Sequence, residues 1–207
     1  MTKKKFLDPN IENKSKTVEE KIQFFKFEGA MLPLPTEIEI SESGTCNRSC
    51  SFCPRSAPGF EDKKEFISNI LHEKLCRELK ELSYKGTIRY SGFVEPLIDK
   101  NIYYLIDMAR KYLPKCNIEM VTNGDPLNLK RLNKLFENGL NRILISAYDG
   151  KEEAQKLEDL CLSAKLTQEQ YIVRHRYYSE EQDFGITLSN RSGLMENAEY
   201  KIVSLKE

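Results

Sequence analysis

The feature that most limits the possible fold is a regular alternation of strand-like and helix-like runs after residue 37. The strand-like runs are EIEISE (37–42), TIRYSG (87–92), NIEMVTNG (117–124), RILISAY (142–148) and YIVRHRYY (171–178), with GITLSN (185–190) as a sixth. Between the first five, apolar residues recur with helical spacing over 67–79, 101–113, 129–136 and 154–161. Strands that alternate with helices of this length predict repeated βα units around a parallel sheet, and hence an α/β fold.

The alternation alone leaves two closures open, a doubly wound sheet and a barrel. A complete eight-stranded barrel takes about 250 residues, and the link between the fifth and sixth strands is too short for a crossover helix. A partial (β/α)5-6 TIM-type barrel with parallel strands therefore fits better. We expect a charged N-terminal arm over residues 1–30 with a short helix near 18–25, a core domain over 31–193 and a C-terminal tail over 194–207.

Charge and hydropathy exclude several classes of partner. The 32 basic and 32 acidic residues give a formal net charge of zero, which predicts no general attraction to nucleic acid or to an anionic membrane. No run of 18 apolar residues occurs, and no apolar segment follows the basic N-terminus as in a secretory signal. We therefore expect a cytoplasmic protein whose cysteines stay reduced and serve metal binding or catalysis rather than disulfides.

Polar or glycine-bearing clusters follow five of the predicted strands. They are the cysteines of GTCNRSCSFCPRS (44–56), SGFVEP (91–96), TNGDP (122–126), Ser146 with YDG (148–150), and Arg174 with Arg176. In parallel α/β folds ligands bind at the carboxyl ends of the strands. We therefore expect these five clusters to converge on one site.

The most informative cluster is the cysteine triplet Cys46, Cys50 and Cys53, with the pattern C-x3-C-x2-C. A structural zinc site needs four protein ligands, and neither His72 nor His175 is close to the triplet in sequence. An iron–sulfur cubane held by three thiolates keeps one iron open for a small-molecule ligand. The residues favour the cubane, and the zinc site remains the alternative.

The motifs resemble those of the radical S-adenosylmethionine (radical SAM) superfamily. CNRSCSFCP resembles the family's cysteine signature, with Phe52 as the aromatic residue before the last cysteine. YSGFVEPLID resembles its glycine–glutamate–proline segment, TNGDPL its T-N-G-x-x-L segment, and LSNRSG (188–193) the sequence that closes the core of the SPASM-type branch. The resemblance implies that the three cysteines hold a [4Fe–4S] cluster and that S-adenosylmethionine chelates the fourth iron through its amino and carboxylate groups.

The resemblance also implies an activity. A one-electron reductant of the flavodoxin or ferredoxin type would reduce the cluster, and cleavage of S-adenosylmethionine would give a 5′-deoxyadenosyl radical. That radical would abstract hydrogen from an unidentified substrate, either a peptide or a sugar-like molecule. The alternative is a non-catalytic zinc- or cluster-binding module, such as the truncated remnant of a larger radical SAM/SPASM enzyme.

The same resemblance assigns a set of cofactor-binding residues, and no catalytic residue. The set is Phe52, Ser91, Gly92, Phe93, Glu95, Thr122, Asn123, Ser146, Arg174 and Arg176. The backbone near Phe52 would lie against the adenine, and Glu95 or its neighbouring carbonyls would accept the amino protons. Ser146 would face the ribose or the carboxylate, and one of the two arginines could pair with that carboxylate.

The chain departs from the family pattern at several places, and two of them affect the expected cofactors. Val94 stands where many members of the family have a second glycine, so the backbone there is expected to approach the ligand less closely. No cysteine follows Cys161, so the auxiliary clusters of the SPASM-type branch are expected to be absent, in a core-only enzyme or a truncated one. Cys76, Cys116 and Cys161 are predicted to be structural.

Overall fold

The computed structural model describes residues 22–50 and 52–177, which contain a hairpin and a parallel sheet. The sheet strands are β3 (Glu37–Ile40), β4 (Thr87–Tyr90), β5 (Asn117–Thr122), β6 (Arg142–Ala147) and β7 (Tyr171–His175). They lie in the order β3-β4-β5-β6-β7, and every neighbouring pair is parallel. Because each strand lies beside the next strand in the chain, the order never reverses as it does in a doubly wound sheet. The α/β prediction and the partial-barrel prediction are confirmed for these strands, and the predicted strand 185–190 lies outside the described residues.

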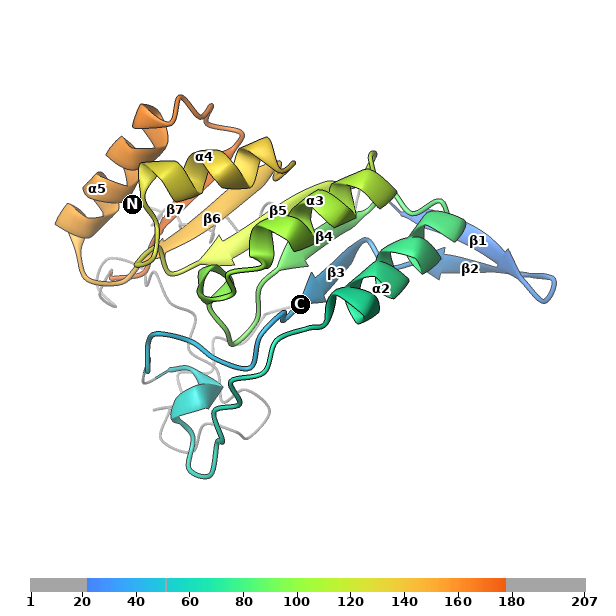
Figure 1. Ribbon diagram of the computed structural model, residues 1–207, viewed down its shortest axis with the longest axis horizontal. Coiled ribbons are helices and arrows are strands. Elements are labelled where there is room, and N and C mark those ends of the chain that lie inside the picture. Colours follow the sequence, from blue (N-terminus) through green and yellow to red (C-terminus); the bar gives the residue numbers. More distant parts are fainter. Residues whose placement is uncertain (1–21, 51, 178–207) are drawn as a thin grey trace, which may run out of the picture.

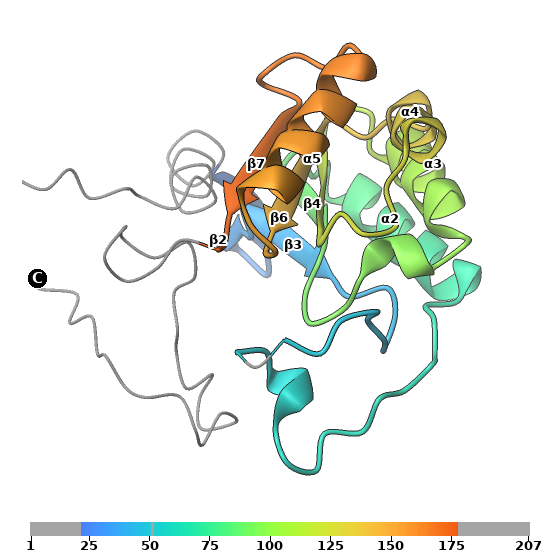
Figure 2. The same ribbon diagram turned by 90° about the vertical axis from the view of Figure 1, so that its left-hand side faces the viewer.

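Within the described residues, four helices cover one face of this sheet (Figures 1 and 2). They are α2 (Asn69–Glu81), α3 (Ile102–Tyr112), α4 (Leu129–Glu137) and α5 (Lys151–Ser163). Ser68 caps α2 by accepting a hydrogen bond from the Leu71 amide at 3.2 Å. Gly139 ends α4 with φ 103°, a backbone conformation that side-chain-bearing residues rarely adopt. None of the helices in the described part of the chain is long and apolar enough to cross a bilayer.

The two faces of the sheet differ in chemistry. Toward the helices, the strands present buried apolar side chains such as Ile88, Ile118 and Met120. On the other face, Glu39, Arg89, Glu119 and Arg142 stand side by side in register, so that charge alternates across four strands. The Arg89 and Glu119 side chains are each 1% exposed and pair at 2.5 Å. The middle of this face is therefore polar. In a barrel, this face of the sheet is the one that points toward the interior.

Two local predictions were wrong. Residues expected to form a short helix near 18–25 instead contribute, from Gln23 onward, to the hairpin β1 (Gln23–Phe27) and β2 (Ala30–Leu34). The hairpin crosses the predicted boundary between the arm and the core domain. Residues before 22 and after 177 lie outside the described residues. The domain boundaries remain a prediction.

The second error concerns one position of the apolar stripe that the helical spacing over 67–79 predicts, Ile67, Leu71, Leu75 and Leu79. Leu79 is buried, and Ile67 and Leu75 pack against the core, so only Leu71 departs from the prediction. Leu71 is 56% exposed, and the buried residues are His72, Cys76 and Leu79. His72 Nε2 lies 2.8 Å from the hydroxyl of Tyr90, which donates to the Leu105 carbonyl at 3.2 Å. Burial lowers the pKa of His72 to about 4, so the ring is neutral and Nε2 shares one hydrogen bond with the Tyr90 hydroxyl. A satisfied internal hydrogen bond thus turns His72 inward in place of Leu71.

Candidate cofactor site

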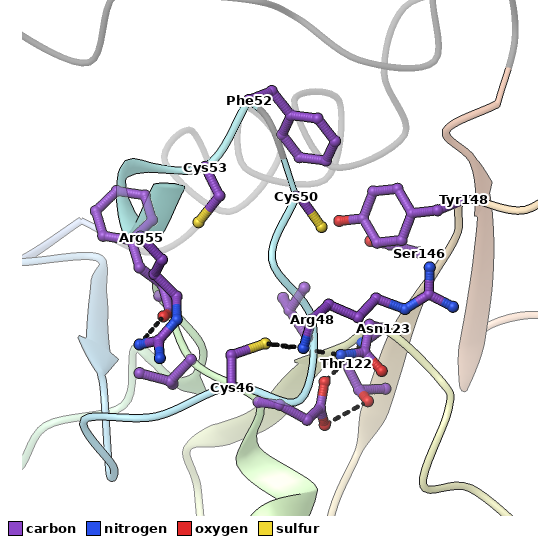
Figure 3. A pocket seen from close by; sticks show the side chains of 15 residues that line it. Cys46, Arg48, Cys50, Phe52, Cys53, Arg55, Thr122, Asn123, Ser146 and Tyr148 are labelled. Carbon is purple, nitrogen blue, oxygen red and sulfur yellow. Dashed lines mark hydrogen bonds between the residues drawn. The ribbon is translucent and has the colours of Figure 1, made fainter. Parts of the chain in front are cut away.

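A pocket opens at the carboxyl ends of β3, β4, β5 and β6, where the cysteine loop folds over the sheet (Figure 3). Its cavity has a volume of about 90 Å³ and is open to solvent on one side. Its lining residues are Cys46, Arg48, Cys50, Phe52, Cys53, Arg55, Gly92, Phe93, Val94, Glu95, Val121, Thr122, Asn123, Ser146 and Tyr148. Four of the five polar clusters that follow the predicted strands therefore meet in one place.

The three cysteines are presented by a tightly turned loop. The Cys53 amide donates to the Cys50 carbonyl at 2.9 Å, and the Ser56 amide donates to the Cys53 carbonyl at 2.9 Å. All three thiols are free and partly buried, and their sulfur atoms point toward a common space (Figure 3). Burial raises the pKa of the Cys46 and Cys50 thiols above the ordinary value of 9.0, so a metal would have to displace protons when it binds there.

The donor set suits a cubane better than a single zinc ion. A tetrahedral zinc with bonds of about 2.3 Å would bring its sulfur ligands to about 3.8 Å from one another. Among the described residues, the only three ligands that gather within 4.8 Å of one another are Asp125, Asp149 and Glu153, so the three sulfurs are spread more widely. The pocket lining in the described chain also contains no histidine and no fourth cysteine. Three separated thiolates, each able to bind a different iron, fit a [4Fe–4S] cluster with one open iron.

Arg55 fixes the second half of the cysteine loop. Its guanidinium donates to the carbonyls of Gly44 at 3.1 Å and Phe93 at 3.2 Å, and it also forms an ion pair with Asp62. Hydrogen bonding from Arg55 holds the pKa of Asp62 below its usual value. The loop is thereby attached to the segment that follows β4.

Glu95 connects the ends of β4 and β5. Its carboxylate, which is 1% exposed, accepts hydrogen bonds from the Leu97 amide at 3.1 Å, the Thr122 hydroxyl at 2.6 Å and the Asn123 amide at 2.8 Å. Burial raises the pKa of Glu95, against the opposing effect of these hydrogen bonds. Both carboxylate oxygens of Glu95 already accept hydrogen bonds from the protein. Glu95 therefore orders the pocket wall.

Gly92 stands where a side chain would not fit. Its φ is 119°, and a Cβ there would collide with the Ser41 hydroxyl oxygen. Gly92 therefore presents only its backbone to the pocket, beside Phe93.

Three of the predicted cofactor-binding residues lie outside the pocket lining. Ser91 is buried and its carbonyl accepts a hydrogen bond from Ser41 at 3.0 Å. Arg174 lies behind the wall and donates to the Ser146 hydroxyl at 2.6 Å. The backbone amide of Arg176 donates to the Ala147 carbonyl at 2.8 Å, and its side chain does not line the pocket.

Five lining residues were not among the assigned cofactor-binding residues: Arg48, Arg55, Val94, Val121 and Tyr148. Of these, Val94 and Tyr148 lie in polar clusters that were expected to converge on the site. The sequence could have indicated Arg48 and Arg55, because Arg48 lies inside the cysteine motif and Arg55 follows it closely. Tyr148 follows β6 at the strand end, and its ring lies 5.6 Å from that of Phe52. Two aromatic rings therefore form one side of the pocket.

A buried carboxyl group at the base of the cysteine loop gives a pH-dependent prediction. Glu42 follows β3 and is 0% exposed, and burial raises its pKa from 4.5 to about 8, with Asp99 and Glu95 adding to the shift. The folded protein thus binds a proton that the unfolded chain releases, so this group's contribution to stability is present below about pH 4.5 and is lost as pH rises to about 8.

We therefore expect Glu42→Gln to flatten the pH dependence of stability. Between pH 4.5 and pH 8, the free energy of unfolding of the parent should fall by about 4 kcal/mol relative to that of the variant. Urea denaturation at the two pH values measures this difference. Glu65→Gln, at an exposed glutamate, is the matched control and should follow the parent. Parallel pH profiles for parent and Glu42→Gln would contradict the prediction.

Three free cysteines thus converge at the mouth of a parallel α/β partial barrel, in a donor set that suits an iron–sulfur cluster. The chain belongs to the radical SAM superfamily, whose family model matches residues 40–187. This confirms the family resemblance and, with it, the cofactors that the family uses, a [4Fe–4S] cluster and S-adenosylmethionine. Enzymes of this family generally need an external reductant. Assignment to the SPASM-type branch remains a prediction.

Individual relatives agree with the family. The chain is 30% identical to S-adenosyl-L-methionine-dependent 2-deoxy-scyllo-inosamine dehydrogenase of Niallia circulans over 161 residues, which are 77% of this chain and 60% of that protein. It is 30% identical over 122 residues to a probable GTP 3′,8-cyclase of Thermococcus kodakarensis, covering 58% of this chain and 38% of the relative. The crystal structure of BtrN in complex with AdoMet and 2-DOIA matches with a TM-score of 0.65 and 27% identity, over 79% of this chain and 63% of that one. The chain thus spans less than two thirds of each of these proteins.

Proposed function

We propose that this chain is the catalytic core of a radical SAM enzyme that cleaves S-adenosylmethionine reductively and abstracts hydrogen from a substrate carbon. The observation that supports this best is the pocket itself, where three cysteines converge and the described lining offers no fourth cysteine or histidine. When bound, the cluster and S-adenosylmethionine supply the radical chemistry. The protein would hold these groups and orient them.

The cluster would be held by Cys46, Cys50 and Cys53, each binding one iron. The turn through Cys50 and Cys53 supports this role, because its backbone hydrogen bonds fix two of the thiols relative to each other. Arg55 would keep this turn over the sheet through its bonds to Gly44 and Phe93.

S-adenosylmethionine would lie between the cluster and the strand ends. Gly92, which lines the pocket with its backbone alone, and its neighbour Phe93 would lie against the methionine amino group. Phe52 would lie against the adenine together with Tyr148, whose ring is its neighbour.

The remaining predicted residues would support these contacts. Thr122 and Asn123 line the pocket and are held by Glu95, so they would fix the floor beneath the ligand. Ser146 would face the ribose or carboxylate, with Arg174 orienting its hydroxyl from behind. Direct roles for Ser91, Arg174 and Arg176 in cofactor binding have no support from the pocket lining.

We further propose a flavodoxin- or ferredoxin-type protein as the reductant, a cytoplasmic location and no general nucleic-acid binding. The balanced charge of the chain favours the last point. For the substrate, the sequence leaves a peptide and a sugar-like molecule open. The name of the Niallia circulans relative, with its inosamine substrate, favours the sugar-like class.

The test is anaerobic reconstitution followed by incubation with S-adenosylmethionine and a strong reductant. The proposal expects a brown protein that forms 5′-deoxyadenosine, detected by chromatography. A colourless protein with one tightly bound zinc ion would instead support the non-catalytic alternative. A protein that holds the cluster but never forms 5′-deoxyadenosine would contradict the proposed activity while leaving the cofactor site in place.

A further inference from the structure

Arg48, inside the cysteine motif between Cys46 and Cys50, contacts three carboxylates that come from distant parts of the chain. Its Nε and Nη2 donate to the two oxygens of Asp125 at 2.7 and 2.5 Å. Its Nη1 and Nη2 donate to the two oxygens of Asp149 at 2.9 and 2.8 Å. A third carboxylate, Glu153, lies 3.2 Å from Nη2. Two of the three contacts are therefore bidentate, the strongest geometry open to an arginine.

The three carboxylates are themselves fixed on the scaffold. Asp125 follows β5, and its backbone amide donates to the side chain of Asn123 at 3.0 Å. Glu153 lies in the first turn of α5 and accepts the backbone amides of Tyr148 at 2.7 Å and Asp149 at 2.8 Å, which follow β6. Arg48 thus joins the cysteine loop to the ends of two different strands.

Asn47, the neighbour of Arg48, makes a second attachment. Its side chain donates to Asp125 at 2.8 Å and accepts from Asn123 at 2.7 Å. The attachment through Asn47 and Arg48 complements the one through Arg55, on the opposite side of the loop (Figure 3).

The acidic trio by itself resembles a cation site, since one oxygen of each residue lies within 4.8 Å of the others. Arg48 already supplies the positive charge there, and its hydrogen bonds hold the pKa of Asp149 below its usual value. Because three negative groups meet one positive group, the net charge beside the pocket is negative even with Arg48 in place. Negative charge next to an iron–sulfur cluster disfavours the addition of an electron.

The contacts are more than an exposed surface pair. Exposed ion pairs contribute little, because solvent and salt screen them. The Arg48 side chain is only 17% exposed, and those of Glu153 and Asp125 are 20% and 33% exposed. Asp149, at 64% exposed, is the most solvated of the three partners. A lysine could not reproduce this arrangement, because it lacks the planar fork that binds two carboxylates at once.

We propose that Arg48 is a positioning residue that fastens the cluster-binding loop to the ends of β5 and β6 and sets the charge beside the cluster. This inference rests on the proposed function, because it assumes that the three cysteines hold a cluster. Two separable consequences follow. The bidentate geometry should govern how long the loop retains iron, and the positive charge should govern the reduction potential.

The experiment compares reconstituted parent protein with Arg48→Gln, Arg48→Lys and the double variant Arg48→Gln/Asp149→Asn. Iron loss to a chelator should be roughly tenfold faster in Arg48→Gln and in Arg48→Lys, because neither side chain can make the paired bidentate contacts.

Arg48→Gln should also shift the midpoint potential of the cluster to a more negative value. Arg48→Lys should return it toward the parent, as should the double variant, which has the parent's local charge. Arg77→Gln, at an exposed arginine on α2, is the control and should match the parent in both measurements.

The outcomes separate this inference from the proposed function. A parent protein that binds no cluster would overturn the proposed function and the inference with it. A parent that binds its cluster while Arg48→Gln and Arg48→Lys retain iron equally well would overturn the fastening role. An unchanged potential in Arg48→Gln would overturn the electrostatic role. If Arg48→Gln cannot be purified folded, Asp125→Asn, which weakens one bidentate contact, should still speed iron loss, and parent-like retention in it would count against the inference.

Discussion

Replacing any one of Cys46, Cys50 and Cys53 with alanine should reduce the iron content from about four per chain to almost none. Each thiolate binds a different iron of the cubane, and the described pocket has no spare cysteine or histidine to take its place. All cleavage of S-adenosylmethionine should be lost with the cluster. Iron and sulfide analysis of the anaerobically reconstituted variants measures the effect.

The matched control removes a thiol away from the site. Cys161 is 0% exposed on α5 and lies outside the pocket lining, so Cys161→Ala should keep the full complement of iron despite some loss of packing. Single cysteine variants that keep four irons would refute the assignment of the ligands. Loss of half the iron in Cys161→Ala would reveal a second cluster.

Glu95→Ala should both destabilise the fold and weaken the binding of S-adenosylmethionine. It would leave the Thr122 hydroxyl and the Asn123 amide buried without their acceptor, and the Leu97 amide without its cap. We expect a loss of about 3–5 kcal/mol in the free energy of unfolding, measured by chemical denaturation. The affinity for S-adenosylmethionine, measured on the clustered protein, should fall at least about tenfold as the wall after β4 loosens.

Glu81→Ala, at an exposed glutamate near the end of α2, controls for loss of a carboxylate and should leave both quantities unchanged. A Glu95→Ala protein as stable as the parent would contradict the network seen here. If the variant is destabilised but binds S-adenosylmethionine with the parent's affinity, Glu95 stabilises the fold and does not affect cofactor binding.

The fold and the centre of the site could be read from the sequence because both depend on local patterns. Period-two and helical spacings place the strands and helices, and the carboxyl ends of parallel strands must meet at one edge of the sheet. The convergence of Cys46, Gly92, Asn123 and Ser146 follows from topology alone, without knowledge of any side-chain conformation.

What could not be predicted depends on contacts between distant residues. The partners of Arg48 lie 77 to 105 positions away, and nothing local to the cysteine motif indicates them. Arg174 is on the right strand, but only the register of β7 with β6 places it behind Ser146. Likewise, spacing could not decide whether Leu71 or His72 faces the core, because the choice depends on Tyr90, which lies on another element.

The central claim is that three cysteines leave one iron open and that S-adenosylmethionine occupies it. The most direct measurement is electron paramagnetic resonance of the reduced protein with S-adenosylmethionine isotopically labelled in its amino nitrogen or carboxylate oxygens. We expect the cofactor to change the spectrum and the labels to couple to the cluster spin, because both groups bind the open iron. A reduced cluster whose spectrum is unchanged at saturating S-adenosylmethionine, with no coupling to either label, would contradict this account.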